Sequence, residues 1–125
     1  MTPPPPVLTP AEQVSADRDA LKTAQTGRVT QIKAAQLTLT NGQKAYVAAK
    51  KALAQAKAAA RKAHQSVDSI DPAFVAAVNA ALATVQQDRT TLATVKKTTA
   101  AAIKAAQKTL AADLVIYHKS LHKKQ

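Results

Sequence analysis

The chain lacks cysteine and tryptophan, and it has one phenylalanine, two tyrosines and two glycines among 125 residues. The absence of cysteine excludes a disulfide framework and a thiolate metal site. Without clustered glycines there is no phosphate-cradling loop, and with so few aromatic rings the stacking of nucleic-acid bases is disfavoured. Acids are scarce as well, since seven Asp and Glu stand against eighteen Lys and Arg. The net charge of +11 favours a polyanionic partner: nucleic acid, an anionic lipid surface or an acidic protein.

What the sequence has in abundance is alanine, with 30 residues, and threonine, with 14. Most of the hydrophobic content is therefore methyl groups. A buried CH₂ contributes roughly 0.8 kcal/mol, so an alanine seam between helices stabilises far less per residue than a leucine seam. We expect one domain whose core is too small to stabilise the fold well by itself. Such a domain would self-associate or dock onto a partner.

Two long ladders of apolar residues, spaced by three and four, flank one short break. The first runs from Val14 to Val67 and the second from Phe74 to Leu121. Such spacing is typical of helices that bury one face. The sequence therefore predicts an all-α fold, a long antiparallel helical hairpin of two helices of roughly 50 residues each. An extended Pro-rich N-terminal arm precedes it, and we expect the hairpin to pack into an oligomer.

The boundaries follow from capping and turn signals. We expect an extended arm over residues 1–9, a first helix over 10–66, a hinge over 67–71, a second helix over 72–122 and a basic tail over 123–125. Thr9 and Glu12 have the spacing of a capping box, and Asp71 before Pro72 caps the second helix. Asn41-Gly42 is a possible break in the first helix, but the apolar spacing keeps its phase across it, which favours a continuous helix.

A fold about the hinge pairs residues whose numbers total about 139. This register places Asp88 near Lys50 and Lys51, and Asp113 near Arg28. The two isolated acids of the second helix would then each face a base of the first.

Basic residues dominate the first helix, because nine bases and no acid lie between Asp19 and Asp68. The candidate polyanion-binding residues are Lys44, Lys50, Lys51, Lys57, Arg61 and Lys62. In composition, residues 50–62 resemble the Lys/Ala-rich segments of linker histones and bacterial nucleoid proteins. This resemblance implies phosphate contacts that are independent of base sequence and weaken steeply with salt. A solvated face that keeps an Ala-rich protein soluble is the alternative explanation.

Several large apolar residues lie off both ladders, and the proline arm is a further candidate contact. We interpret them as contacts to other subunits: Pro3, Pro4, Pro5, Pro6, Val29, Leu37, Val47, Val75, Val115 and Ile116. Binding to a membrane surface is disfavoured, because Trp and Phe anchors are nearly absent.

The sequence offers little for catalysis. Acids are few, and a two-helix hairpin provides no cleft in which a base and a nucleophile could be positioned. His118 and His122 have a spacing that can hold a metal, but no third ligand is near and the surrounding lysines repel cations. We expect no enzymatic activity, no cofactor, no metal and no small-molecule substrate.

These observations favour a non-enzymatic structural or assembly protein, a basic helical hairpin that docks into a larger complex. A minor virion component of a tailed phage is the most concrete form of this hypothesis. The alternative is a non-specific DNA-binding protein of the nucleoid type, which uses the lysine stripe on the first helix. A secreted hairpin of the type-VII-secretion kind is disfavoured, since Asp68-Ser69-Ile70 stands where Trp-x-Gly would be. The N-terminus resembles no signal peptide and no window is apolar enough to cross a bilayer, so we expect a virion or cytoplasmic location.

Overall fold

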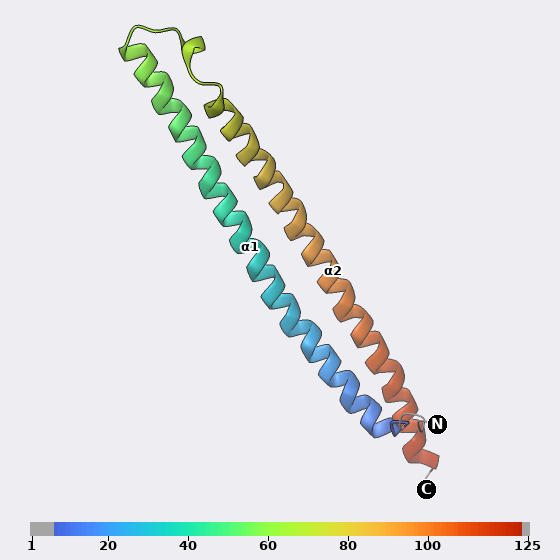
Figure 1. Ribbon diagram of the computed structural model, residues 1–125. Helices are drawn as coiled ribbons and strands as arrows, with labels where there is room; N and C mark the ends of the chain where they lie inside the picture. Colours follow the sequence, from blue (N-terminus) through green and yellow to red (C-terminus); the bar gives the residue numbers. More distant parts are fainter. Residues whose placement is uncertain (1–6, 124–125) are drawn as a thin grey trace, which may run out of the picture. The chain divides into compact units, whose positions relative to one another are not determined.

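The computed structural model describes residues 7–123, and within this range it contains two long α-helices, one short 3₁₀-helix and no strand. Helix α1 spans Pro10–Lys62, η1 spans Val67–Ser69 and α2 spans Ala73–Lys123 (Figure 1). The two long helices pack against each other, which confirms the predicted all-α helical hairpin. Helix α1 runs through Asn41 and Gly42 without a break. In neither helix is any described stretch apolar enough to span a membrane.

Helix α1 begins at the predicted capping box. The Thr9 amide donates to Oε1 of Glu12 at 3.1 Å, and the Glu12 amide donates to the Thr9 hydroxyl oxygen at 3.2 Å. The backbone hydrogen bond from Thr9, and then its side-chain hydrogen bond, hold the pKa of Glu12 below its ordinary value. Of the predicted arm, residues 1–6 lie outside the described range, and Val7 and Leu8 precede α1 without regular structure.

The C-terminal end of α1 lies at Lys62 rather than at Ser66 as the sequence predicts. His64 has a φ of 60°, so it is in the left-handed region that stops a helix. The His64 amide donates to the carbonyl of Arg61 at 3.1 Å, and the Gln65 amide donates to that of Ala60 at 2.8 Å. These two bonds are a Schellman motif, formed here without the glycine that usually marks it in a sequence.

The connection between the helices, residues 63–72, is held by side-chain caps. The hydroxyl oxygen of Ser66 accepts from the Asp68 amide at 3.2 Å and starts η1. Oδ1 of Asp71 accepts from the Ala73 amide at 2.9 Å and starts α2. The cap predicted at Asp71 is therefore present, and α2 begins one residue after Pro72.

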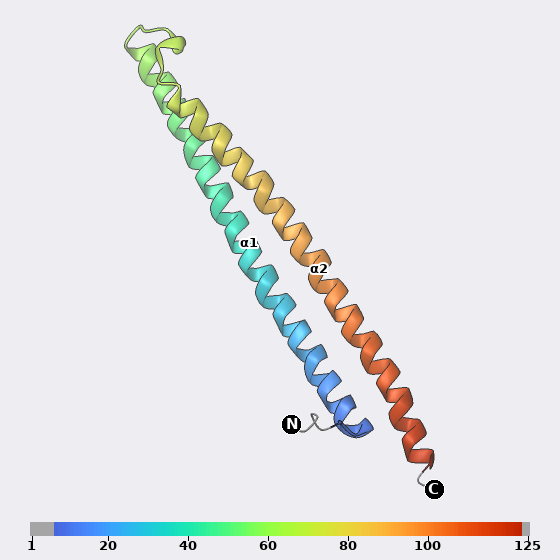
Figure 2. The same ribbon diagram turned by 45° about the vertical axis from the view of Figure 1, so that its right-hand side comes forward.

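The chain divides into two compact units, of which unit 2 comprises residues 32–95. Its core is the buried cluster of Leu39, Val85 and Leu92, against which Ile32, Ala35 and Tyr46 pack. Within unit 2 the last turns of α1 extend past the first turn of α2, as Figures 1 and 2 both show.

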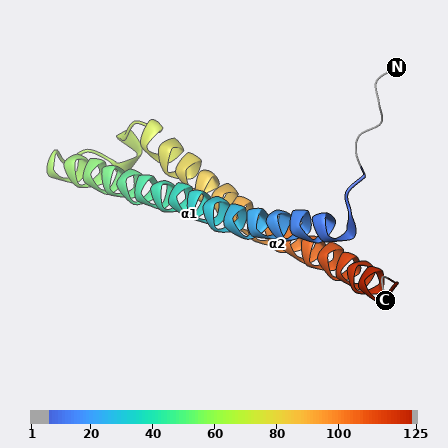
Figure 3. The same ribbon diagram turned by 90° about the horizontal axis from the view of Figure 1, so that it is seen from below.

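Unit 1 comprises the N-terminal part of the chain up to Gln31 together with the part from Lys96 onward. Its described part contains the start of α1 and the end of α2, which lie at the same end (Figure 3). The buried residues of this unit are Val14, Asp17 and Thr99. Two of the three are polar, so the core of unit 1 is thin and unusually polar.

The predicted register is wrong in both units. In unit 2, Gly42 faces Asp88, and in unit 1, Asp17 faces Asp113, so facing residue numbers total about 130 rather than about 139. Asp88 therefore does not lie opposite Lys50 and Lys51, and Asp113 does not lie opposite Arg28. The difference has two causes. The connection, residues 63–72, is twice as long as the predicted hinge, and the last turns of α1 extend past the first turn of α2 (Figure 1).

Candidate functional site

The basic face of α1 lies in unit 2. Lys44, Lys50, Lys51, Arg61 and Lys62 are exposed, and Lys57 is half-buried. None of these side chains makes an ion pair with a described residue. The Nζ atom of Lys50 lies 4.3 Å from the centre of the Tyr46 ring, a cation–π contact. Five bases are thus exposed and free of acidic partners.

The bases do not form the single stripe that their sequence suggests. We call the face of α1 that contains the buried residues Leu39 and Ala60 the seam. By helical spacing, the opposite side of α1 contains Lys44, Lys51 and Lys62. Lys50, Lys57 and Arg61 fall beside the seam. Lys57 lines a hollow of the connection together with Leu53 and Val75. A polyanion that follows α1 would therefore contact one row of three bases at a time.

The apolar residues predicted to contact other subunits are exposed where the structure describes them. Their exposed fractions lie between 47% for Val75 and 62% for Leu37, with Val29, Val47, Val115 and Ile116 in between. Val29, Val115 and Ile116 belong to unit 1, and Leu37, Val47 and Val75 belong to unit 2. The predicted contacts Pro3, Pro4, Pro5 and Pro6 lie outside the described residues.

Further apolar surface surrounds the connection in unit 2. Phe74, Val67 and Val75 are exposed, and Ile70 is half-buried between two hollows. One hollow is lined by alanines of α1 with Phe74, and the other by Leu53, Lys57 and Pro72. The chain's only phenylalanine is thus on the surface rather than in the core.

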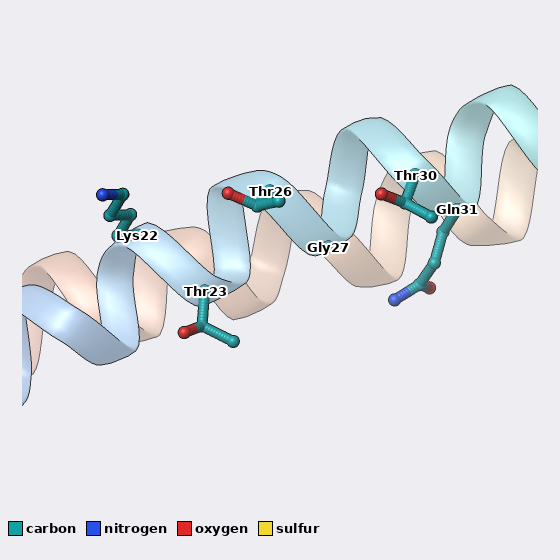
Figure 4. Close-up of a pocket in the computed structure, with 6 residues that line it drawn as sticks. All are labelled: Lys22, Thr23, Thr26, Gly27, Thr30 and Gln31. Atoms are coloured by element: carbon teal, nitrogen blue, oxygen red, sulfur yellow. The ribbon is translucent and has the colours of Figure 1, made fainter.

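A hollow of about 470 Å³ lies on α1 in unit 1, where Gly27 has no side chain. Thr26 and Thr30 lie on one side of Gly27 and Thr23 and Gln31 on the other (Figure 4). The polar groups of its lining are the threonine hydroxyls, the amide of Gln31 and the ammonium of Lys22, with no acid.

The seam also contains charged atoms without partners. Oδ2 of Asp88 and Nε of Arg28 are buried and make no hydrogen bond. A methyl group added at Gly42 would lie 2.6 Å from Oδ2 of Asp88. Gly42 has no positive φ, so what it provides is room for this carboxylate rather than an unusual backbone.

Asp17 is the most buried acid of the chain, with an exposed fraction of 6%. Its Oδ1 accepts a hydrogen bond from Nε2 of Gln13 at 3.1 Å, and its Oδ2 has no partner. The facing Asp113 is half-buried, and a hydrogen bond to Asp17 raises the pKa of Asp113. Burial and the negative charge of Asp17 act in the same direction.

Sequence reasoning missed this pair. The predicted register placed Asp113 near Arg28 and so did not bring Asp113 and Asp17 together. The signal was in the spacing, since Asp17 lies three residues after Val14 and four before Leu21, on the apolar ladder itself.

The two C-terminal histidines lie one helical turn apart on α2. His118 and His122 are both exposed. Across residues 7–123, three or more His, Cys, Asp or Glu side chains nowhere gather closely enough to hold an ion.

Comparison with known proteins finds no matching family model, no similar curated protein and no similar solved structure.

Proposed function

We propose that this protein is a non-enzymatic assembly protein, a basic helical hairpin that is completed by docking against other subunits. The observation that carries the proposal is the imbalance between buried and exposed apolar residues. Among described residues, five hydrophobic residues are buried, and one of them is an alanine, whereas eleven large hydrophobic residues are exposed. Each Å² of apolar surface removed from water stabilises an interface by roughly 25 cal/mol. The exposed hydrophobic residues therefore favour association with other subunits.

The test is size-exclusion chromatography with light scattering at micromolar concentration. We expect self-association. Leu37→Ser, Val47→Ser and Val115→Ser should shift the distribution toward monomer. The matched control is Ala48→Ser, an exposed residue of α1 that buries little apolar area in any contact. A stable, cooperatively folded monomer that remains unchanged by the three substitutions would contradict the proposal.

The most concrete form of this proposal is a minor virion component of a tailed phage. It is supported by the small helical architecture and by the positive charge, which suits a position close to packaged DNA. Mass spectrometry of purified virions would detect the chain at a fixed copy number, and its absence from them would remove this form of the proposal.

Non-specific DNA binding is the second candidate function, and the unpaired bases of α1 favour it. From Ile32 to Lys62 the helix has seven bases and no acid, and none of the seven is in an ion pair with a described residue. The logarithm of the binding constant should fall steeply with the logarithm of the salt concentration. Replacing Lys44, Lys51 and Lys62 with Gln should reduce that slope by about 3 if this row holds the phosphates. Replacing Lys96, Lys97 and Lys104 removes equal charge from α2 and is the matched control.

A further inference from the structure

Two carboxyl groups meet across the seam of unit 1, although acids are rare in this chain. Asp17 projects from α1 and is nine-tenths buried, with Oδ1 held by Gln13 and Oδ2 without a partner. Asp113 projects from α2, half-buried, within hydrogen-bonding reach of Asp17. In a protein with eighteen bases and seven acids, a pairing of two acids in the seam requires an explanation.

The groups that surround the pair do not neutralise it. The charged or titratable neighbours on α1 are Arg18, Asp19 and Lys22, all exposed, and those on α2 are His118 and Lys119, exposed, and Tyr117, half-buried. Arg28 lies further along the seam, about three turns from Asp17. No described base forms an ion pair with either carboxyl group. Two ionised carboxylates would therefore repel each other, whereas a single shared proton lets one donate an O–H hydrogen bond to the other.

Few described residues of unit 1 are fully buried. Val14 is its one buried hydrophobic residue among those described, and Thr99 is buried beside the same seam. The other large apolar residues on its packed faces, such as Leu21, Leu110 and Leu114, are only half-buried.

We infer that Asp17 and Asp113 form a proton-binding site that tightens unit 1 in acid. One proton shared between the two carboxyl groups holds α1 to α2, and its loss leaves two repelling carboxylates in the seam. This inference is independent of the proposed assembly function, because it concerns contacts within one chain.

The direction of the pH dependence follows from Asp113. The hydrogen bond to Asp17, together with burial and the charge of Asp17, raises the pKa of Asp113 above its ordinary 3.8. A group whose pKa is higher in the folded state adds stability that is fully present below its unfolded value and is lost as pH rises through the folded value. The pair therefore makes unit 1 less stable as pH rises, which is opposite to the effect of a carboxylate paired with a base.

The experiment compares wild type, Asp113→Asn, Asp17→Asn and the exposed control Asp19→Asn between pH 4 and pH 8. Thermal unfolding by circular dichroism gives Tm, and amide hydrogen exchange of residues 14–24 and 106–117 reports on unit 1 alone. Carboxyl-carbon NMR of wild type follows the two aspartates directly. Asp113→Asn is the informative variant, because its amide can donate the hydrogen bond that the shared proton makes, at every pH.

We expect Asp113→Asn to raise Tm at pH 7 by about 4 °C and to slow exchange in unit 1, with a smaller gain or none at pH 4. Asp19→Asn should keep the wild-type pH dependence, and the pKa of Asp113 should lie above 3.8 in wild type. Equal pH dependence in wild type and Asp113→Asn, or two aspartates that both titrate at ordinary values, would overturn the inference. So would a rise in the Tm of wild type, but not of the Asn variants, on addition of Ca²⁺ or Mg²⁺ at pH 7, because the carboxyl groups would then bind a cation rather than a proton.

Discussion

The two glycines of this chain should respond differently to the same substitution. Gly27 and Gly42 both lie in the interior of α1, and neither has a positive φ. Replacing a glycine by alanine inside a helix ordinarily adds about 0.5–1 kcal/mol of stability. A Cβ at Gly27 would have only the end of Gln31 near it, at 3.8 Å. Gly27→Ala should therefore gain the full amount.

At Gly42 the same Cβ would lie 2.6 Å from Oδ2 of Asp88 and 3.7 Å from Cγ2 of Val85. Only the contact with the carboxylate is too close, so Asp88 has to leave its rotamer, at a cost of about 0.5–1.5 kcal/mol. This cost offsets the gain in helix propensity. We expect Gly42→Ala to be neutral or destabilising, and to differ from Gly27→Ala by about 1 kcal/mol, or about 4 °C in Tm.

The assay is urea unfolding followed by circular dichroism at 222 nm, on both alanine variants in wild type and in an Asp88→Ala background. In wild type, the buried Oδ2 of Asp88 has no partner, which destabilises the fold by about 1–3 kcal/mol. Asp88→Ala removes this oxygen and should therefore itself be stabilising. In that background Gly42→Ala should gain as much as Gly27→Ala, and the double-mutant cycle gives the coupling between Gly42 and Asp88. A Gly42→Ala variant that is as stabilised as Gly27→Ala in wild type would refute the close approach of the helices at this position.

Three further predictions concern the helix ends. His64→Gly should stabilise the protein by about 1 kcal/mol, because glycine adopts a φ of 60° without steric cost, and a lower Tm for this variant would contradict the Schellman geometry. Asp71→Ala should destabilise it by about 1 kcal/mol and speed hydrogen exchange in the first turn of α2, whereas Asp68→Ala, whose side chain caps nothing, should have little effect. The pKa of Glu12, measured by NMR, should lie below 4.5. The helix stabilisation that Glu12 provides is then present above pH 4.5 and is lost as pH falls through the lowered pKa. Glu12→Gln should abolish this loss, and an unchanged acid transition in that variant would show that the capping box is not its cause.

The sequence was sufficient to predict the two helices because their signals are local and redundant. The capping box at Thr9, the Asp71 cap and some fifty residues of apolar spacing on each side all indicate the same elements. The continuity of α1 through Gly42 followed from phase alone. The end of α1 could not be predicted in this way, because a histidine rather than a glycine takes the left-handed conformation there.

The register was wrong for a different reason. It depends on how the connection leaves α1, and residues 63–72 contain a Schellman motif, a 3₁₀ turn and an Asp cap in succession. Each motif can be recognised in the sequence. How far the three together shift α2 along α1 depends on their three-dimensional geometry, which the spacing of apolar residues does not specify. Asp113 was consequently assigned to Arg28 instead of Asp17, and the carboxyl pair could be found only once the register was known.

The polar atoms left without partners in the seam offer a reason for this register. Alanine-rich faces have little shape to distinguish one alignment of two helices from another, so a slip of one heptad changes the apolar contacts only slightly. Arg28 and Asp88 each bury one atom without a hydrogen bond, at an expected cost of about 1–3 kcal/mol apiece. A slip would move Asp88 away from the room at Gly42 and against a residue that has a Cβ. We interpret these side chains as residues that select the alignment at the expense of stability. Asp88→Ala should then be more stable than wild type but populate additional registers, which disulfide cross-linking of introduced cysteine pairs would detect.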